Sequence, residues 1–254
     1  MNLTGSGDPV RTLALLWREP ADVPGSQRGP RPGLDLRALV EAAIALADAE
    51  GLDAVSMRRV AQLLGVSPMS LYTYVPGKGE LLDLMVDACY ARMERRAPAD
   101  GSWRARLQAI ADDHRALFRS HPWLVDVSTV RPPLGPGLMQ KYEYELRALD
   151  GLGLTDLEMD AALSFLLGFV ETIARADAVS RPAAGDLASD AAWWEAQAPL
   201  LARVFDPTRF PTAARVGSAA GEAQGAAFDP DLAYGFGMER ALDGLALLIA
   251  SRRA

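Results

Sequence analysis

The stretch from Ala54 to Gly79 holds three basic side chains and no acidic one. The cations are Arg58, Arg59 and Lys78, and they stand out because the whole chain of 254 residues carries a formal charge of −7. Arginine and lysine bind phosphate oxygens, which carboxylates repel. We therefore expect this local positive region to contact nucleic acid, although the overall charge excludes a generally basic, DNA-coating protein.

Two short helices must position these side chains. Ser56 can cap a first helix, and Ser67 followed by Pro68 is a strong start signal for a second. Gly65 lies between them, so the spacing is that of a helix-turn-helix. The residues that would hold the two helices at a steep angle are small or apolar: Val60, Ala61, Leu64, Val66 and Leu71.

The solvent side of the second helix carries short or flat side chains, which can approach the floor of a DNA groove closely. These residues are Pro68, Met69, Ser70, Thr73 and Tyr74. A plain pair of helices with a solvated basic face is the alternative interpretation.

The run from Ser56 to Val75, with Lys78 after it, resembles the helix-turn-helix of the TetR family of transcriptional repressors. Trp103, the Gly151 and Gly153 turn, and the run Phe236–Glu239 resemble, in order and spacing, the ligand domain of the tetracycline repressor. The resemblance spans about residues 34–179 and 230–250. It implies an all-α fold, with an N-terminal three-helix DNA-binding domain and a C-terminal helical domain for ligand binding and dimerisation.

The resemblance also assigns DNA contacts. Arg58 matches a residue that reads a base in the major groove, and its planar fork suits guanine. Met69 is a candidate for contact with a thymine methyl group, and Lys78 matches a lysine that anchors the DNA backbone. Tyr72 suits a core position equally well. The full expected set is Ser56, Arg58, Arg59, Pro68, Met69, Ser70, Tyr72, Thr73, Tyr74 and Lys78.

The chain divides into three expected parts. Residues 1–33 are rich in Pro and Gly, which predicts a flexible arm with no more than one helical turn, near Leu13–Trp17. Arg28 and Arg31 in this arm either reach the minor groove or belong to a free tail. Residues 34–80 form the DNA-binding domain, with the helix-turn-helix at about 55–74, and residues 81–254 form the ligand and dimerisation domain. Within the latter, residues 180–229 are expected to be loop-like, with one helical piece near Trp193–Phe205.

Several residues of the second domain are candidates for the wall of a mostly apolar ligand pocket. His114 is the strongest, because a buried imidazole needs a partner or a ligand. An ordinary hydrophobic core is the alternative for each. The expected ligand residues are Ile110, His114, Leu117, Trp123, Val127, Met139, Tyr142, Phe165 and Phe169.

A magnesium-dependent effector does not fit this domain. The tetracycline repressor holds a drug–magnesium chelate with a histidine after the helix that begins at the tryptophan, and Ser128 stands near that position here. Two histidines, His114 and His121, without a nearby acidic cluster do not make a metal site. We expect no metal and no cofactor, and a small hydrophobic compound in place of tetracycline–magnesium.

Two further helices, about 155–179 and 230–251, carry more apolar surface than one subunit needs to bury. Thr155 and Glu158 have the spacing of a capping box at the start of the first. The resemblance implies that this pair meets its two-fold mate in a homodimer, which lets two recognition helices read a palindromic operator. A monomer core completed by the same helices is the alternative.

Other functions remain as alternatives. A constitutive DNA-binding factor would share the first domain and lack the ligand. An enzyme is disfavoured because Cys89 has no histidine near it in sequence and no glycine-rich phosphate loop follows a strand. The apolar run Ala161–Val170 is about half of what a membrane span needs. One cysteine and no secretion signal at the start predict a cytoplasmic protein.

Overall fold

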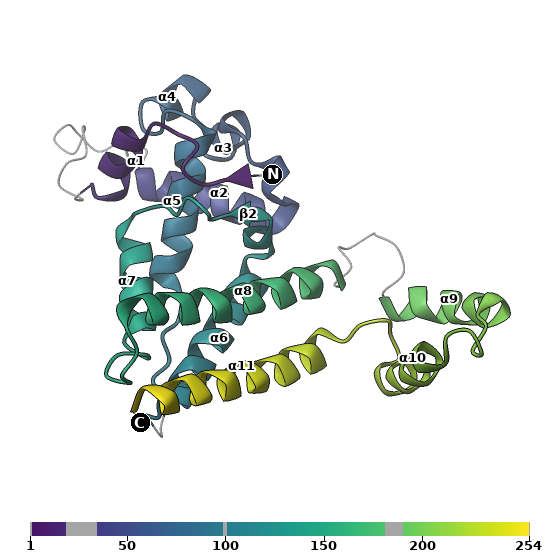
Figure 1. The fold of residues 1–254 in the computed structure, drawn as a ribbon. Coiled ribbons are helices and arrows are strands. Elements are labelled where there is room, and N and C mark those ends of the chain that lie inside the picture. Colours follow the sequence, from purple (N-terminus) through teal and green to yellow (C-terminus); the bar gives the residue numbers. More distant parts are fainter. Residues whose placement is uncertain (1, 19–34, 99–100, 181–189, 254) are drawn as a thin grey trace.

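The computed structural model describes residues 2–18, 35–98, 101–180 and 190–253, and it confirms the all-α fold. Eleven α-helices lie in these ranges, together with two short 3-10 helices and one pair of two-residue strands. Helices α1 to α5 form a group at the top of Figure 1, and α5 leads down into a second group of longer helices. None of the helices in the described ranges is both long enough and apolar enough to cross a membrane.

The upper group is built around α2 (Leu36–Glu50), α3 (Met57–Leu63) and α4 (Pro68–Tyr72). Gly51, with φ of 82°, ends α2, and Gly65, with φ of 67°, makes the turn between α3 and α4. Both values lie in the left-handed region that glycine adopts at little cost, so the two turns are encoded locally. The predicted helix-turn-helix is therefore present, and Leu71 of α4 is fully buried against the core of this group.

Helix α5 (Lys78–Arg92) joins the two groups, because it packs on α2 on one side and on α7 (Pro136–Leu146) on the other. The Asp87 carboxylate of α5 caps α7 by accepting hydrogen bonds from the backbone amides of Gly137 at 3.1 Å and Leu138 at 2.8 Å. A carboxylate at the start of a helix satisfies its free amides and the positive end of its dipole. Helices α5 and α7 are thus held together at a buried cap.

The lower group is built from α6 (Trp103–Ser120), α8 (Asp156–Ser180) and α11 (Pro230–Arg253). Helices α8 and α11 lie side by side and run in opposite directions (Figure 1). The predicted capping box at the start of α8 is confirmed: Glu158 accepts from the Thr155 amide at 2.9 Å, and the Thr155 hydroxyl accepts from the Glu158 amide at 3.3 Å.

The prediction of a flexible arm over residues 1–33 is wrong for residues 2–17. Strand β1 (Asn2–Leu3) pairs in parallel with β2 (Val127–Ser128), and α1 (Pro9–Leu16) packs on α5. Buried carboxylates of α5 attract this segment, since Asp83 accepts from the Gly5 amide at 2.8 Å and Glu80 from the Asp8 amide at 3.0 Å. These partners are more than 70 positions apart in sequence. Arg28 and Arg31 lie outside the described residues.

The region 180–229, expected to be loop-like with one helical piece near Trp193–Phe205, contains two helices in its described part. They are α9 (Asp190–Val204) and α10 (Pro211–Gln224). The second helix was missed because its Gly, Ser and Ala content resembles that of a loop. Figure 1 shows both helices projecting to one side of the α8–α11 pair. Residues 181–189 lie outside the described part of the chain.

Candidate nucleic-acid interface and ligand domain

The exposed side of α4 carries uncharged side chains. Met69 is 74% exposed and Tyr72 is 47% exposed, whereas Leu71 between them points into the core. Of the two interpretations of Tyr72, the core position is therefore excluded, and Tyr74 is the tyrosine that packs partly against the core. A protruding methionine has no folding role at this place, so its side chain is available to a groove.

Local hydrogen bonds fix the start and end of α4. The Ser67 hydroxyl accepts from the Ser70 amide at 3.2 Å, which caps the helix, and Pro68 occupies its first position. The Thr73 hydroxyl donates to the Ser70 carbonyl at 2.6 Å. One helix earlier, the Ser56 hydroxyl caps α3 by accepting from the Arg59 amide at 3.3 Å. The cap expected at Ser56 is therefore present, and its hydroxyl is already engaged within the protein.

The three cations of the interface differ in their surroundings. Arg58 is exposed in the first turn of α3. Arg59 instead forms two hydrogen bonds to Glu50, the last residue of α2, with Nη1–Oε2 at 2.9 Å and Nη2–Oε1 at 2.7 Å. The Lys78 ammonium at the start of α5 donates to the Leu52 carbonyl at 3.4 Å. Arg58 is thus the cation best placed to reach a base. In the protein without DNA, Arg59 and Lys78 are hydrogen-bonded to other residues of the chain.

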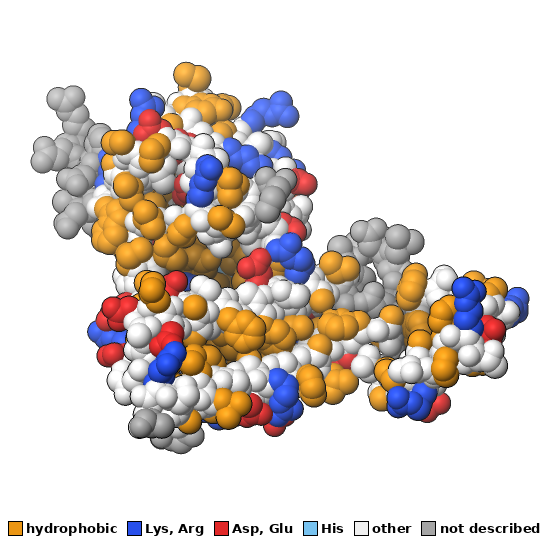
Figure 2. All heavy atoms as spheres, in the orientation of Figure 1, with side chains coloured by type: hydrophobic (Ala, Val, Ile, Leu, Met, Phe, Trp, Pro, Cys, Tyr) orange, Lys and Arg blue, Asp and Glu red, His pale blue; other side chains and the backbone are white. Residues whose placement is uncertain are grey.

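Figure 2 shows these features on the surface. Hydrophobic side chains protrude at the top of the molecule, over α4, and basic side chains flank them on both sides. An uncharged tip between cations is the arrangement expected of a helix that enters a groove while its neighbours contact the two backbones.

The interior of the second domain contains a buried charged cluster that no local pattern in the sequence indicates. His114 of α6 shares a hydrogen bond with Glu145 of α7, Nε2 to Oε1 at 2.5 Å, and Lys141 donates to the other carboxylate oxygen at 2.9 Å. All three side chains are buried, and the Lys141 ammonium also lies 5.1 Å from the centre of the Tyr90 ring. The buried imidazole thus has a partner, as its burial requires.

The environment sets the charges of this cluster. Burial lowers the pKa of His114, although Glu145 acts in the opposite direction. Burial by itself would raise the pKa of Glu145, but the hydrogen bonds and charges of His114 and Lys141 outweigh it and lower that pKa. We therefore describe the cluster at neutral pH as a Lys141–Glu145 ion pair with a neutral His114 that donates to the carboxylate.

The other expected ligand residues are dispersed. Ile110 and Leu117 are buried on α6 but belong to separate hydrophobic clusters. Trp123, in the 3-10 helix η3 (Pro122–Asp126), is buried and donates to Asp48 of α2 at 2.8 Å. Val127, in β2, is buried and lines a hollow between the two domains.

The remaining four lie on α7 and α8. Met139 and Tyr142 are on the outer side of α7, because its inner side is occupied by Gly137, Lys141 and Glu145. Phe165 of α8 is 60% exposed. Phe169 stacks on Tyr234 of α11, with ring centres 6.3 Å apart. The structure therefore does not gather the nine residues into one site, and their common role in ligand binding stays a prediction.

Two kinds of reactive site can be examined in the described part of the chain, a nucleophilic cysteine and a metal cluster. Burial raises the pKa of the Cys89 thiol to about 12, which disfavours the thiolate needed for nucleophilic attack. Within the described residues, no three His, Cys, Asp or Glu side chains come together as metal ligands would.

Comparison with known proteins identifies the family. Residues 39–85 match the family model of bacterial regulatory proteins of the tetR family, and residues 97–249 match that of the tetracyclin repressor-like C-terminal domain. The chain belongs to the TetR family. Members of this family are DNA-binding transcriptional regulators, so the resemblance of the helix-turn-helix is confirmed.

Among relatives of this TetR family protein is the HTH-type transcriptional repressor DrrR1 of Streptomyces coeruleorubidus, which is 46% identical over 98% of this chain and 90% of its own. Apo ActR from Streptomyces coelicolor superposes with a TM-score of 0.71 at 30% identity, covering 87% of this chain and 98% of that one. ActR has also been solved in complex with actinorhodin, with a TM-score of 0.71, 29% identity, and 85% and 98% coverage.

Proposed function

We propose that this TetR family protein is a repressor that binds a palindromic operator as a homodimer and is released from it by a small hydrophobic effector. The exposed, uncharged face of α4 carries the proposal, because Met69 protrudes there between the cations of α3 and α5. Arg58 reads a base, and Arg59 and Lys78 contact phosphates. The cytoplasm is the compartment that suits this role and a chain with one cysteine.

Dimerisation is supported by an apolar stripe along α8 and α11, visible across the lower half of Figure 2. A single chain leaves this stripe open to solvent, and exposed apolar patches of this kind usually mark an interface. A two-fold axis through this stripe relates the α4 helices of the two subunits. Each α4 then reads one half-site, and the two half-sites are separated by one helical turn of DNA or by a whole number of turns. The exposed apolar residues of the two helices are Leu157, Phe165, Val179, Leu232, Phe236 and Leu247.

A ligand-responsive role is supported by ActR, which binds actinorhodin and (S)-DNPA in the solved complexes. In the present chain, an effector beside His114 would act on Glu145 of α7, and α7 is capped by Asp87 of α5. A shift of α6 thus reaches α5 and changes the separation of the two α4 helices. Such coupling is typically about 1–3 kcal/mol and is reciprocal, so DNA weakens effector binding equally.

The preferred duplex is first identified by selecting the sequences that the protein binds from a library of random DNA duplexes. Arg58→Ala should then cost about 1–3 kcal/mol on that duplex and relax specificity at one base pair, with little change on random DNA. Lys78→Ala is the matched control, since it should weaken all duplexes alike and reduce the salt slope by about 1 for each subunit, or about 2 for the homodimer. A failure to select any duplex would overturn the proposed function. If Arg58→Ala weakened binding to the selected duplex and to random DNA equally, Arg58 would contact only phosphate and would not read a base.

A further inference from the structure

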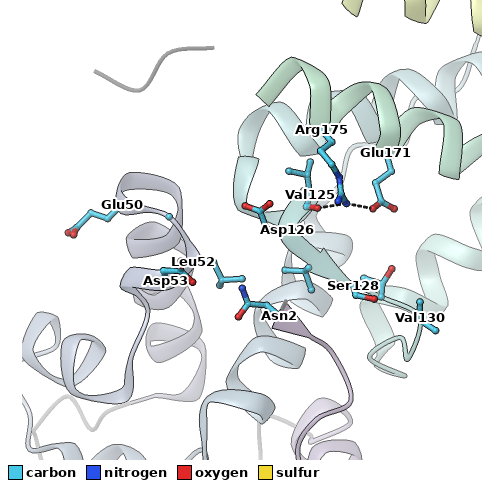
Figure 3. Close-up of a pocket in the computed structure, with 13 residues that line it drawn as sticks. Asn2, Glu50, Leu52, Asp53, Val125, Asp126, Ser128, Val130, Glu171 and Arg175 are labelled. Carbon is cyan, nitrogen blue, oxygen red and sulfur yellow. Dashed lines mark hydrogen bonds and ion pairs between the residues drawn. The ribbon is translucent and has the colours of Figure 1, made fainter. Parts of the chain in front are cut away.

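The N-terminal strap, as we call residues 2–17, begins on the second domain. Strand β1 pairs there with β2, and Figure 3 shows Asn2 beside the run that carries Ser128. The backbone amide of Thr4 donates to the Ser128 carbonyl at 3.2 Å, and its hydroxyl donates to the Arg131 carbonyl at 2.7 Å. Thr4 is fully buried, so these acceptors satisfy polar groups that water does not reach.

The middle of the strap crosses the first half of α5. The Gly5 amide donates to Asp83 at 2.8 Å, and the Asp8 amide donates to Glu80 at 3.0 Å. Both carboxylates are buried. A buried carboxylate needs donors, and hydrogen bonds to a charged acceptor are stronger than those between neutral groups. The two acids of α5 therefore hold the strap in place.

Two glycines allow the strap to lie directly on α5. A Cβ atom at Gly79 of α5 would lie 2.8 Å from the Ser6 hydroxyl oxygen and 3.0 Å from the Gly7 amide nitrogen. A Cβ atom at Gly7 would lie 2.6 Å from the Glu80 carboxylate. A side chain at either glycine would thus force the strap and α5 apart.

The end of the strap returns to the second domain. Helix α1 packs on α5, where Leu16 joins the hydrophobic core of the upper group. The next residue, Trp17, donates through its indole nitrogen to the Leu134 carbonyl at 2.7 Å. The strap therefore runs from one end of the segment 127–134, across α5, to the other end of that segment.

These attachments connect the two matched domains of the chain. Glu80 and Asp83 lie in the match to the DNA-binding family model, residues 39–85. The acceptors of the strap at its two ends lie in the match to the C-terminal domain, residues 97–249. The strap precedes both matches, so it is an additional connection between the domains.

Helix α4 follows any movement of α5, because the connection between them is short and buried. The two helices are separated by residues 73–77 alone. Leu71, Val75 and Leu81 are each 0% exposed and belong to one hydrophobic cluster. A strap that holds α5 against the segment 127–134 therefore also holds α4 relative to the second domain.

We propose that the strap is a positioning element for DNA recognition, which narrows the range of separations between the two α4 helices of the dimer. In this way it sets how strictly the protein selects the spacing of the two half-sites. This inference rests on the proposed function. Freedom in the position of α4 would be lost on binding to two half-sites at once, so a strap that removes it beforehand also tightens binding to correctly spaced DNA.

Half-site spacing is the property that distinguishes this role from a general contribution to folding. One additional base pair between the half-sites moves one of them by about 3.4 Å and rotates it by roughly 35° about the DNA axis. Recognition helices with a fixed separation cannot follow this change, whereas helices free to move can. A loss of folding alone would weaken binding to every duplex by the same factor.

The release variant combines Thr4→Val with Gly7→Val. The first change removes the hydroxyl donor, and the second places a side chain against the Glu80 carboxylate. The matched control, Thr208→Val with Gly217→Val, makes the same changes at exposed positions outside the strap. Gly217 has nothing within 4 Å of an added Cβ atom. Gly7→Ala alone is the milder variant, to be used if the pair does not fold.

The DNA test compares the selected duplex with versions that have one base pair inserted or removed midway between the half-sites. The wild type and the control should discriminate strongly against both altered duplexes. In the release variant, the ratio of affinities for the selected and the altered duplexes should fall by about three- to tenfold, the range of one net hydrogen bond. An unchanged ratio, including one in which all duplexes are weakened alike, overturns the proposal.

The separation of the two α4 helices is tested without DNA, by electron–electron distance measurement between spin labels. Each subunit carries one label at Ala38→Cys, on the exposed side of α2, and the buried Cys89 is replaced by Ala in all variants. The distribution of distances between the two subunits should be broader in the release variant than in the wild type and the control. Equal widths overturn the positioning role.

The two measurements also separate this inference from the proposed function. If no duplex can be selected but the distance distribution broadens in the release variant, the proposed function fails and the restraint by the strap stands. If a duplex is selected but neither the spacing ratio nor the distribution changes, the strap has no positioning role and the proposed function stands. A protein that gives no distance between subunits is not a dimer, which overturns both.

Discussion

The guanidinium of Arg59 is held by the carboxylate of Glu50 through two hydrogen bonds of 2.9 and 2.7 Å, so a cation of the DNA-binding face begins in an ion pair within the protein. Glu50 is the last residue of α2, and Arg59 lies in α3, which places this acid beside the basic region of the interface. Both side chains remain more than 40% exposed. An ion pair this exposed is weak, so DNA phosphate can compete for the guanidinium.

Glu50→Gln should therefore strengthen DNA binding. The change removes one negative charge near the phosphates and frees Arg59, so affinity should rise on specific and random duplexes alike. The log–log dependence of affinity on salt should steepen by about 1 for the additional phosphate contact of each subunit, and so by about 2 for the homodimer. Fluorescence anisotropy at several salt concentrations measures both. An unchanged slope would mean that Arg59 does not reach phosphate, and Glu143→Gln, on exposed α7 surface, serves as the control.

The helix-turn-helix was predictable because its signals are local. Ser56 and Ser67 cap helices that begin at the next residue, and Gly65 takes the left-handed conformation that the turn requires. Each feature depends on side chains within a few positions of the backbone that it shapes. The same holds for the capping box of Thr155 and Glu158.

The features that were missed depend on partners far away in the sequence. The acid-free stretch from Ala54 to Gly79 does not include Glu50. In the folded chain, however, the Glu50 carboxylate lies against the Arg59 guanidinium. Helical periodicity places Lys141 and Glu145 on a solvent face, yet they are buried because they neutralise each other and His114 completes the cluster. The consequence is that Met139 and Tyr142 face outward. Pairings of this kind need the fold before they can be recognised.

Phe165→Glu should produce a monomer. Phe165 is 60% exposed in the single chain, where nothing requires it for folding, and a carboxylate would be desolvated at a two-fold interface on α8. Light scattering after size-exclusion chromatography measures the oligomer, and affinity for the palindromic duplex should fall with it. Val10→Glu, an equally radical change at an exposed site on α1, should leave the oligomer unchanged. A dimeric Phe165→Glu variant would place the interface elsewhere.

Gly137→Ala should loosen the contact between α5 and α7. A Cβ atom at Gly137 would overlap the carbonyl oxygen of Asp87 and lie 2.9 Å from the amide nitrogen of Ala91, both of which are backbone atoms of α5. Overpacking of this kind costs about 1–3 kcal/mol of unfolding free energy. Gly217→Ala in α10 meets nothing within 4 Å. This control should gain up to about 1 kcal/mol from helix propensity. Urea denaturation compares them, and equal stabilities would mean that α7 shifts freely on α5.

His114→Gln should reveal a pH-dependent part of the stability. Burial lowers the pKa of His114 in the folded chain, so below its ordinary value of about 6.5 the unfolded chain takes up a proton that the folded chain does not. The unfolding free energy of the wild type therefore falls as the pH drops through this range, by at most about 1.4 kcal/mol per pH unit for one proton. Glutamine can still donate to Glu145 but takes up no proton.

The His114→Gln variant should have a lower unfolding free energy than the wild type at about pH 7.5. This difference should become smaller as the pH falls to about 5.5. Burial also raises the pKa values of Asp83 and Asp87, which opposes this trend, but His114 acts on neither carboxyl, so their effect is the same in both proteins and cancels in the difference. Urea denaturation at each pH gives the two free energies. A deficit that stays constant or grows on acidification would mean that His114 is charged in the folded protein, and the Lys141–Glu145 pair would then carry a second cation in the buried cluster.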